Sequence, residues 1–146
     1  MIENERQYRI TRGWVEQFRQ SAAQMAAPGA ATDPLIQAAM VAQYQSQLKE
    51  MQHDLDEYDA LRDGRVTSRE LDSLAGLPDA LIRARIAARL TQKELATRLG
   101  LQEQQIQRYE STRYNGVSLE RAQAVLDALG VRIQERLILS KVERGS

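Results

Sequence analysis

The stretch TQKELATRLGLQEQQIQRYE, residues 91–110, decides the fold of the C-terminal half of the chain. Thr91 and Glu94 have the spacing of a capping box at the start of a helix. Gly100 is suited to end that helix, because glycine adopts positive φ without a Cβ clash. A second helix follows and carries Ile106 on its inner side. The stretch therefore predicts two short helices joined by a tight turn.

This pattern resembles the helix-turn-helix of the Xre/Cro-repressor family of DNA-binding proteins. The resemblance covers roughly residues 77–131, and the matching residues are Thr91-Gln92, Leu95-Ala96, Gly100-Leu101, Ile106 and Tyr109-Glu110. It implies an all-α fold with a five-helix, lambda-repressor-like DNA-binding domain. It also implies a sequence-specific, repressor-like regulator that binds double-stranded DNA as a homodimer. An ordinary helical hairpin is the alternative explanation of the pattern.

The distribution of charge supports a DNA-binding half. The chain has 20 basic and 20 acidic residues, so its formal net charge is zero. Residues 1–76 hold 8 basic and 12 acidic residues, a balance of −4, whereas residues 77–146 hold 12 and 8, a balance of +4. The basic half contains the helix-turn-helix stretch, which favours contact with phosphate groups.

Several classes of protein are disfavoured by composition. The chain has no cysteine and hence no disulfide, and its polar N-terminus is not typical of a signal peptide. No apolar run approaches the ~20 residues that a membrane span needs. The single histidine, His53, and the acidic residues that follow it lack the spacing of a metal cage or a catalytic site. We therefore expect a cytoplasmic, non-membrane protein that is no enzyme and needs no cofactor or metal.

Residues 1–66 are expected to form a long helical hairpin. The first helix runs from Glu3 to about Ala27, with apolar residues at Ile10, Trp14, Phe18, Ala22 and Met25. The second runs from Pro34 to about Arg62 and carries a heptad seam of Val41, Tyr44, Leu48, Met51, Leu55 and Tyr58. Such helices must bury their stripes, either against each other or against another protein. We expect a second subunit or a partner to contact Trp14, Phe18, Tyr44, Leu48, Met51 and Leu55.

The remaining boundaries follow from helix caps and periodicity. Residues 67–76 are expected to be a linker with a short helix that starts at Thr67 or Ser68. Residues 77–131 form the DNA-binding domain, and its last helix follows Ser118. Residues 132–146 form a C-terminal tail, where apolar residues on alternate positions weakly favour a short strand. Such a strand would need a partner, such as the same strand of a second subunit.

The outer face of the second motif helix is the expected site of base recognition. With Ile106 as the inward point and 100° per residue, Gln104, Gln105, Gln107 and Arg108 fall on the outer half. Glutamine amides bind adenine and arginine binds guanine through two hydrogen bonds. Soluble glutamines on a solvated helix are the alternative explanation. The expected phosphate contacts are Gln92, which matches the family position for this role, together with Lys93, Arg113, Tyr114 and Asn115.

Glu110 falls on the inner half of the same helix, where an unpaired carboxylate would cost several kcal/mol. The family resemblance implies a partner for it at Arg85, on the first helix of the domain. We interpret this pair as structural.

Two functions share the predicted DNA-binding role. The first is the dimeric regulator, in which residues 1–66 mediate dimerisation. The second is an antitoxin of a type II toxin–antitoxin module, similar to Xre-type antitoxins of the HigA kind, in which the N-terminal helices bind a toxin protein. An oligomerisation scaffold without DNA binding is a third alternative, and the presence of Gln104 and Arg108 argues against it.

Overall fold

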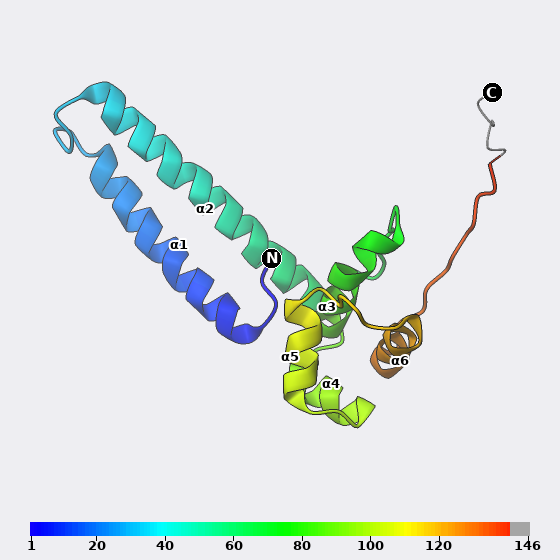
Figure 1. Ribbon diagram of the computed structural model, residues 1–146. Helices are drawn as coiled ribbons and strands as arrows, with labels where there is room; N and C mark the ends of the chain where they lie inside the picture. The colour runs from blue at the N-terminus through cyan, green and yellow to red at the C-terminus, as the bar shows by residue number, and fades with distance from the viewer. Residues whose placement is uncertain (141–146) are drawn as a thin grey trace.

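A computed structural model describes residues 1–140, and every regular element among them is a helix, so the all-α class is confirmed. Two long helices form a hairpin that projects from a compact group of four shorter helices (Figure 1). The hairpin consists of α1 (Glu5–Ala26) and α2 (Pro34–Arg62). The compact group consists of α3 (Leu77–Ala87), α4 (Gln92–Leu99), α5 (Glu103–Ser111) and α6 (Leu119–Leu129), preceded by the 3-10 turn η1 (Leu74–Gly76).

The inner face of α1 differs from the predicted stripe. Tyr8 and Val15 are buried, whereas Ile10 and Trp14 are 49% and 50% exposed. The inner positions instead follow a spacing of 3, 4, 3 and 4, along Tyr8, Thr11, Val15, Phe18 and Ala22. The physical reason is the seam of α2, which repeats every seven residues and requires a partner with the same period. Residues spaced four apart shift progressively around a helix of 3.6 residues per turn, so Ile10 and Trp14 lie away from the side that faces the α2 seam.

The N-terminal residues join the hairpin to the compact group. Ile2 is 5% exposed, and the backbone carbonyl of Glu3 accepts a hydrogen bond from Arg85 Nη2 at 2.7 Å. On the hairpin side of this junction, Arg83 of α3 forms a 2.6 Å ion pair with Glu57 of α2. Buried leucines on both sides continue the core from the hairpin into the domain. The two parts therefore share one packed interior.

The segment between the hairpin and α3 has less helix than predicted. No helix starts at Thr67 or Ser68, and only the single turn of η1 forms, with the Ser73 hydroxyl as its N-cap. The apolar side chains of this segment remain largely in solvent, with Leu74 at 70% exposure. A helix here would have no apolar face to bury, so caps alone do not stabilise it. The compact group consequently has four α-helices and one 3-10 turn, and not the five helices that the resemblance implies.

The predicted C-terminal strand is also absent where the structure describes this region. Residues 132–140 have no regular structure, and Leu137, Ile138 and Leu139 are 82–92% exposed. A strand needs a hydrogen-bonded neighbour, and the described part of this chain offers none. Residues 141–146 of the predicted tail lie outside the described residues. None of the described helices has the length and hydrophobicity required to cross a bilayer.

Candidate DNA-binding interface

The turn between α4 and α5 is built by local contacts that the sequence encodes. The Thr91 hydroxyl accepts from the Glu94 backbone N–H at 3.1 Å, and the Glu94 carboxylate accepts from the Thr91 N–H at 2.9 Å. Gly100 ends α4 with φ of 68°, in the left-handed region that glycine tolerates. The Leu101 N–H then donates to the Ala96 carbonyl at 2.9 Å, which closes the turn. This geometry fixes where α5 begins.

Small and aliphatic side chains hold α5 against the rest of the domain. Leu95 and Ile106 are fully buried and Ala96 is 1% exposed. The small alanine allows α4 and α5 to approach closely, and Val125 of α6 completes the core beneath them. With its inner side fixed in this way, α5 presents its opposite side to solvent as a rigid surface.

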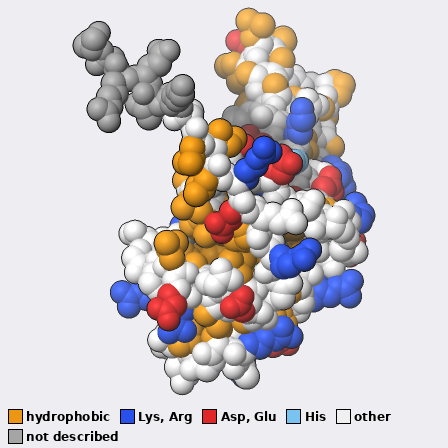
Figure 2. Space-filling model, turned by 90° about the vertical axis from the view of Figure 1, so that its right-hand side faces the viewer, with side chains coloured by type: hydrophobic (Ala, Val, Ile, Leu, Met, Phe, Trp, Pro, Cys, Tyr) orange, Lys and Arg blue, Asp and Glu red, His pale blue; other side chains and the backbone are white. Residues whose placement is uncertain are grey.

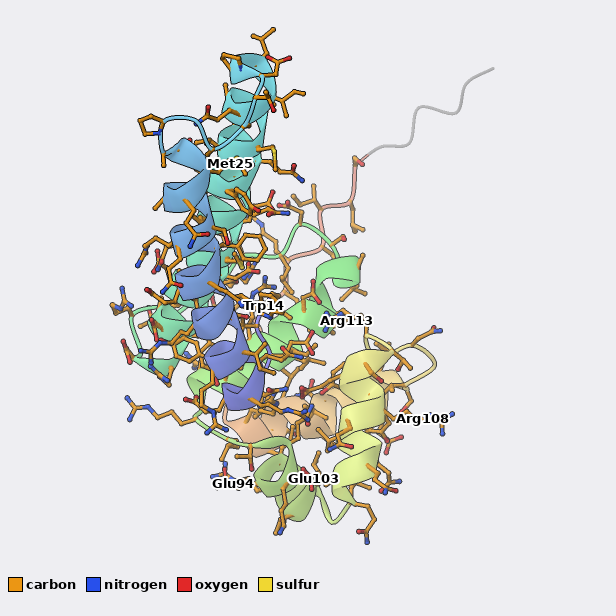
Figure 3. All side chains as sticks on the ribbon, turned by 90° about the vertical axis from the view of Figure 1, so that its left-hand side faces the viewer. Trp14, Met25, Glu94, Glu103, Arg108 and Arg113 are labelled. Carbon is orange, nitrogen blue, oxygen red and sulfur yellow. The ribbon has the colours of Figure 1, made fainter. Side chains whose placement is uncertain are left out.

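The structure places all four predicted base-reading residues on that exposed side: Gln104, Gln105, Gln107 and Arg108. Arg108 points away from the domain (Figure 3). Gln105 differs from the others, because its amide oxygen accepts from the Gln102 backbone N–H at 2.9 Å and so helps to start the helix. Gln107 lies 3.5 Å from Glu103 on the preceding turn, a weak contact. Gln104 and Arg108 are therefore the side chains best placed to reach a base.

Arg85 and Glu110 lie together beneath this face. Arg85 Nε donates to Glu110 Oε2 and Arg85 Nη2 donates to Glu110 Oε1, both at 2.7 Å, and the side chains are 3% and 1% exposed. Gln92 Nε2 donates to Glu110 Oε1 at 3.1 Å. Arg85 Nη1 donates to the Leu90 carbonyl at 2.9 Å, and Nη2 also donates to the Glu3 carbonyl. Each charge is thus compensated, as burial of an ion pair requires.

The five predicted phosphate contacts do not all face solvent. Lys93 and Asn115 are exposed, and Gln92 is half-buried beside Glu110. Arg113 forms ion pairs with Glu3 at 2.5 Å and with Asp79 at 3.4 Å. Its guanidinium is therefore engaged within the chain, although the side chain remains 46% exposed.

The prediction for Tyr114 was wrong, because its ring belongs to the core and is 8% exposed. Arg113 and Tyr114 have φ of 52° and 56°, in the left-handed region. This backbone turns the Tyr114 ring inward, where it packs 5.7 Å from the ring of Tyr109. Burial and the nearby Glu110 carboxylate raise the pKa of the Tyr114 phenol. Its hydroxyl is buried and has no hydrogen-bond partner among residues 1–140, which the structure describes.

The predicted hairpin contacts fall into two groups. Leu55 is 5% exposed and packs inside the chain, so its assignment to an intermolecular contact was wrong: α2 buries it in the intramolecular core. Leu48 and Met51 are half-buried against the same core. Trp14, Phe18 and Tyr44 form a chain of rings with centroids 6.0 and 5.7 Å apart, and Trp14 remains half exposed.

Glu3 is a residue of this site that sequence reasoning missed. Its carbonyl binds Arg85 and its carboxylate binds Arg113, so it contacts both the buried ion pair and the loop after α5. No local pattern marks it, because its partners lie 82 and 110 positions further along the chain. Among the residues that the structure describes, no group of three or more His, Cys, Asp or Glu side chains is arranged to hold a metal ion.

Comparison with known proteins identifies this domain. Residues 81–136 match the family model for a helix-turn-helix domain, a region that begins within α3 and extends beyond α6. No curated protein and no solved structure matches the chain. The match agrees with the capped α4, the glycine turn and the exposed face of α5. Residues 81–136 are therefore a helix-turn-helix domain of the Xre/lambda-repressor-like family, and the chain that carries them is a DNA-binding regulator of transcription.

Proposed function

We propose that the protein acts as a homodimeric, repressor-like regulator that inserts α5 of each subunit into the major groove of a palindromic site. The observation that carries this proposal is the face formed by Gln104, Gln107 and Arg108, which is exposed on a helix fixed from behind by Leu95 and Ile106. Amide and guanidinium groups on a rigid helix are suited to read base edges.

We assign separate roles to the polar residues around α5. Gln104 and Arg108 would read bases, with Gln107 beside them, while Gln105 helps to begin the helix. Lys93 and Asn115 would contact phosphates and set the register of the domain on DNA. Gln92 would brace Glu110 and bind a phosphate at the start of α4.

The antitoxin function is the second candidate, and exposed hydrophobic groups on the hairpin support it. Ile10 and Trp14 of α1 are half exposed, which offers a protein partner an aromatic anchor. An antitoxin would bind DNA in the same way and use this face for a toxin. A reading frame for a small basic protein beside the gene would favour the antitoxin over the stand-alone regulator.

In-vitro site selection with the purified full chain tests the proposed function. The expected result is an enriched palindrome whose half-sites are centred one helical turn, ~34 Å, apart. The same experiment with Arg108→Ala should lose preference at one position of each half-site. Recovery of no enriched sequence, together with no binding to any duplex at low ionic strength, would overturn the proposal.

A further inference from the structure

The distal half of the hairpin is almost free of charge. Residues 20–48 contain one charged residue, Asp33, although charged residues make up 27% of the whole chain. The space-filling view shows the end of the hairpin at the top as mostly hydrophobic and neutral surface (Figure 2). Charge depletion is the compositional mark of the centre of a protein interface. This segment therefore differs from an ordinary solvated helical hairpin.

The end of the hairpin is held in a defined conformation. Gln37 Nε2 donates to the carbonyls of Met25 and Ala27, at 2.8 and 2.9 Å, and so satisfies groups at the end of α1. Asp33 caps α2 by accepting from the Leu35 N–H at 2.9 Å. Leu35 and Ile36 nevertheless remain 81% and 56% exposed. The hairpin thus presents apolar side chains outward from a fixed end.

A second heptad stripe runs along α2 beside its inner seam. Ile36, Met40, Gln43 and Gln47 are spaced 4, 3 and 4. The last three each lie one position before a residue of the seam that faces α1, and Ile36 precedes Gln37, which bonds to the end of α1. This spacing places them on one flank of the helix. Met40 is half-buried, while Ile36, Gln43 and Gln47 are exposed. The stripe carries no charge until Glu50, where it continues into the acidic part of the helix.

We propose that this stripe binds the same stripe of a second copy of the chain, so that two hairpins form a four-helix bundle. In a two-fold contact the stripe of one subunit meets the same stripe of the other, so charged side chains of one sign along it would face each other and repel. Glutamine amides avoid this repulsion, because each is both a donor and an acceptor. The inference deepens the homodimer of the proposed function by naming its contact surface.

The charges of α2 argue against a basic protein as the occupant of this stripe. The acidic residues lie in the other half of the helix, and several are already matched within the chain. Glu57 pairs with Arg83, and Asp59 pairs with Arg62 at 2.8 Å. A basic partner would therefore bind the acidic C-terminal half of α2 and not residues 36–47. A neutral surface can instead pack against the same surface of a second copy without charge repulsion.

Sedimentation equilibrium of the full chain tests the proposal. The wild type should dimerise, and Gln43→Glu with Gln47→Glu should raise the dissociation constant at least about tenfold through like-charge repulsion. The matched control is Ala38→Glu with Gln45→Glu, which adds the same charge to the other flank and should leave the dimer unchanged. Mixing the glutamate pair with a Gln43→Lys, Gln47→Lys pair should restore a heterodimer.

A monomeric wild type at concentrations of about 100 μM would overturn the proposal, as would a dimer disrupted only by the control pair. DNA binding by the same preparations separates this result from the proposed function. If the dimer contact fails while α5 is a true reading helix, the chain still enriches a half-site at low ionic strength. If no sequence is enriched but the charge swap restores a dimer, the DNA-reading proposal fails and the contact surface stands.

Discussion

Arg85 of α3 and Glu110 of α5 join the first and third α-helices of the DNA-binding domain through two parallel hydrogen bonds of 2.7 Å. Both side chains are almost completely buried. Arg85→Ala should therefore lower the free energy of unfolding by about 3–5 kcal/mol, since it leaves the Glu110 carboxylate buried without its cation. Urea denaturation followed by circular dichroism measures this loss.

The matched control for that variant is the simultaneous replacement Arg85→Met and Glu110→Leu. It removes both charges together and should recover most of the stability lost in the single variant. A loss below about 1 kcal/mol in Arg85→Ala would contradict the structural role of the pair.

Glu3→Gln should change the salt dependence of DNA binding. In the wild type, Glu3 and Asp79 hold the Arg113 guanidinium, so this cation is not free to meet a phosphate. Weakening the Glu3 contact releases Arg113, and one added phosphate contact should steepen the slope of log K against log salt by about 0.9. Filter binding between 50 and 200 mM salt gives this slope. Glu5→Gln is the control, because Glu5 pairs with Arg62 of the hairpin; an equal change in both variants would contradict the prediction.

Tyr114→Phe should stabilise the protein or leave its stability unchanged. The Tyr114 hydroxyl is buried and finds no partner in the described part of the chain. A buried unsatisfied hydroxyl costs about 1–3 kcal/mol. Removal of the oxygen keeps the packing of the ring, so the free energy of unfolding at pH 7 should rise by about 1 kcal/mol. A fall of this size would show that the hydroxyl makes a stabilising contact in solution.

The same residue predicts a dependence on alkaline pH. Burial raises the pKa of the folded phenol above its ordinary value of 10.0, so the unfolded chain loses this proton first. The stabilising contribution is complete below pH 10 and declines as the pH rises above it. Unfolding free energies measured from pH 9 to 11.5 should fall less steeply in Tyr114→Phe. Burial also raises the pKa values of Tyr8 and Tyr58. These two residues account for the decrease in stability with pH that remains in Tyr114→Phe.

Arg108→Ala and Lys93→Ala should both weaken DNA binding, but only the loss in Arg108→Ala should depend on the DNA sequence. Loss of Arg108 should cost ~1–3 kcal/mol on the selected site and little on a site mutated at the base that it reads. Loss of Lys93 should weaken binding about equally on every sequence, because a phosphate contact carries no base information. Fluorescence anisotropy on matched and mismatched duplexes distinguishes them. Uniform losses in both variants would show that Arg108 binds the backbone.

The DNA-binding motif was predictable because its determinants are local. The Thr91 and Glu94 cap, the turn at Gly100 and the inward position of Ile106 each depend on residues a few positions apart. Placement of Gln104 and Arg108 on the outer side follows from the same helical periodicity.

The sequence-based predictions were wrong where contacts between distant residues, or the local backbone conformation, determine the position of a side chain or helix. Two successive left-handed residues turn the Tyr114 ring inward, and a loop carries no periodicity that would reveal this. On α1, the apolar periodicity placed Ile10 and Trp14 on one stripe with Phe18, but the partner helix fixes which face is buried, and Tyr8 and Val15 lie on that face. Thr67 and Ser68 are suitable cap residues, but the segment after them has no surface on which a helix would pack, and only the turn η1 forms.

The contact between Glu3 and Arg85 spans 82 positions of sequence and has a consequence for how the molecule unfolds. Ile2 and Glu3 occupy a place in the interior that the DNA-binding helices cannot fill themselves. A fragment of residues 67–131 alone would lack Ile2 and Glu3. It would therefore have a cavity where Ile2 packs, and an Arg85 N–H group would lose the Glu3 carbonyl as its acceptor. The hairpin and the domain should therefore melt in a single cooperative transition, and the boundary visible in the ribbon does not divide the protein into independently stable units.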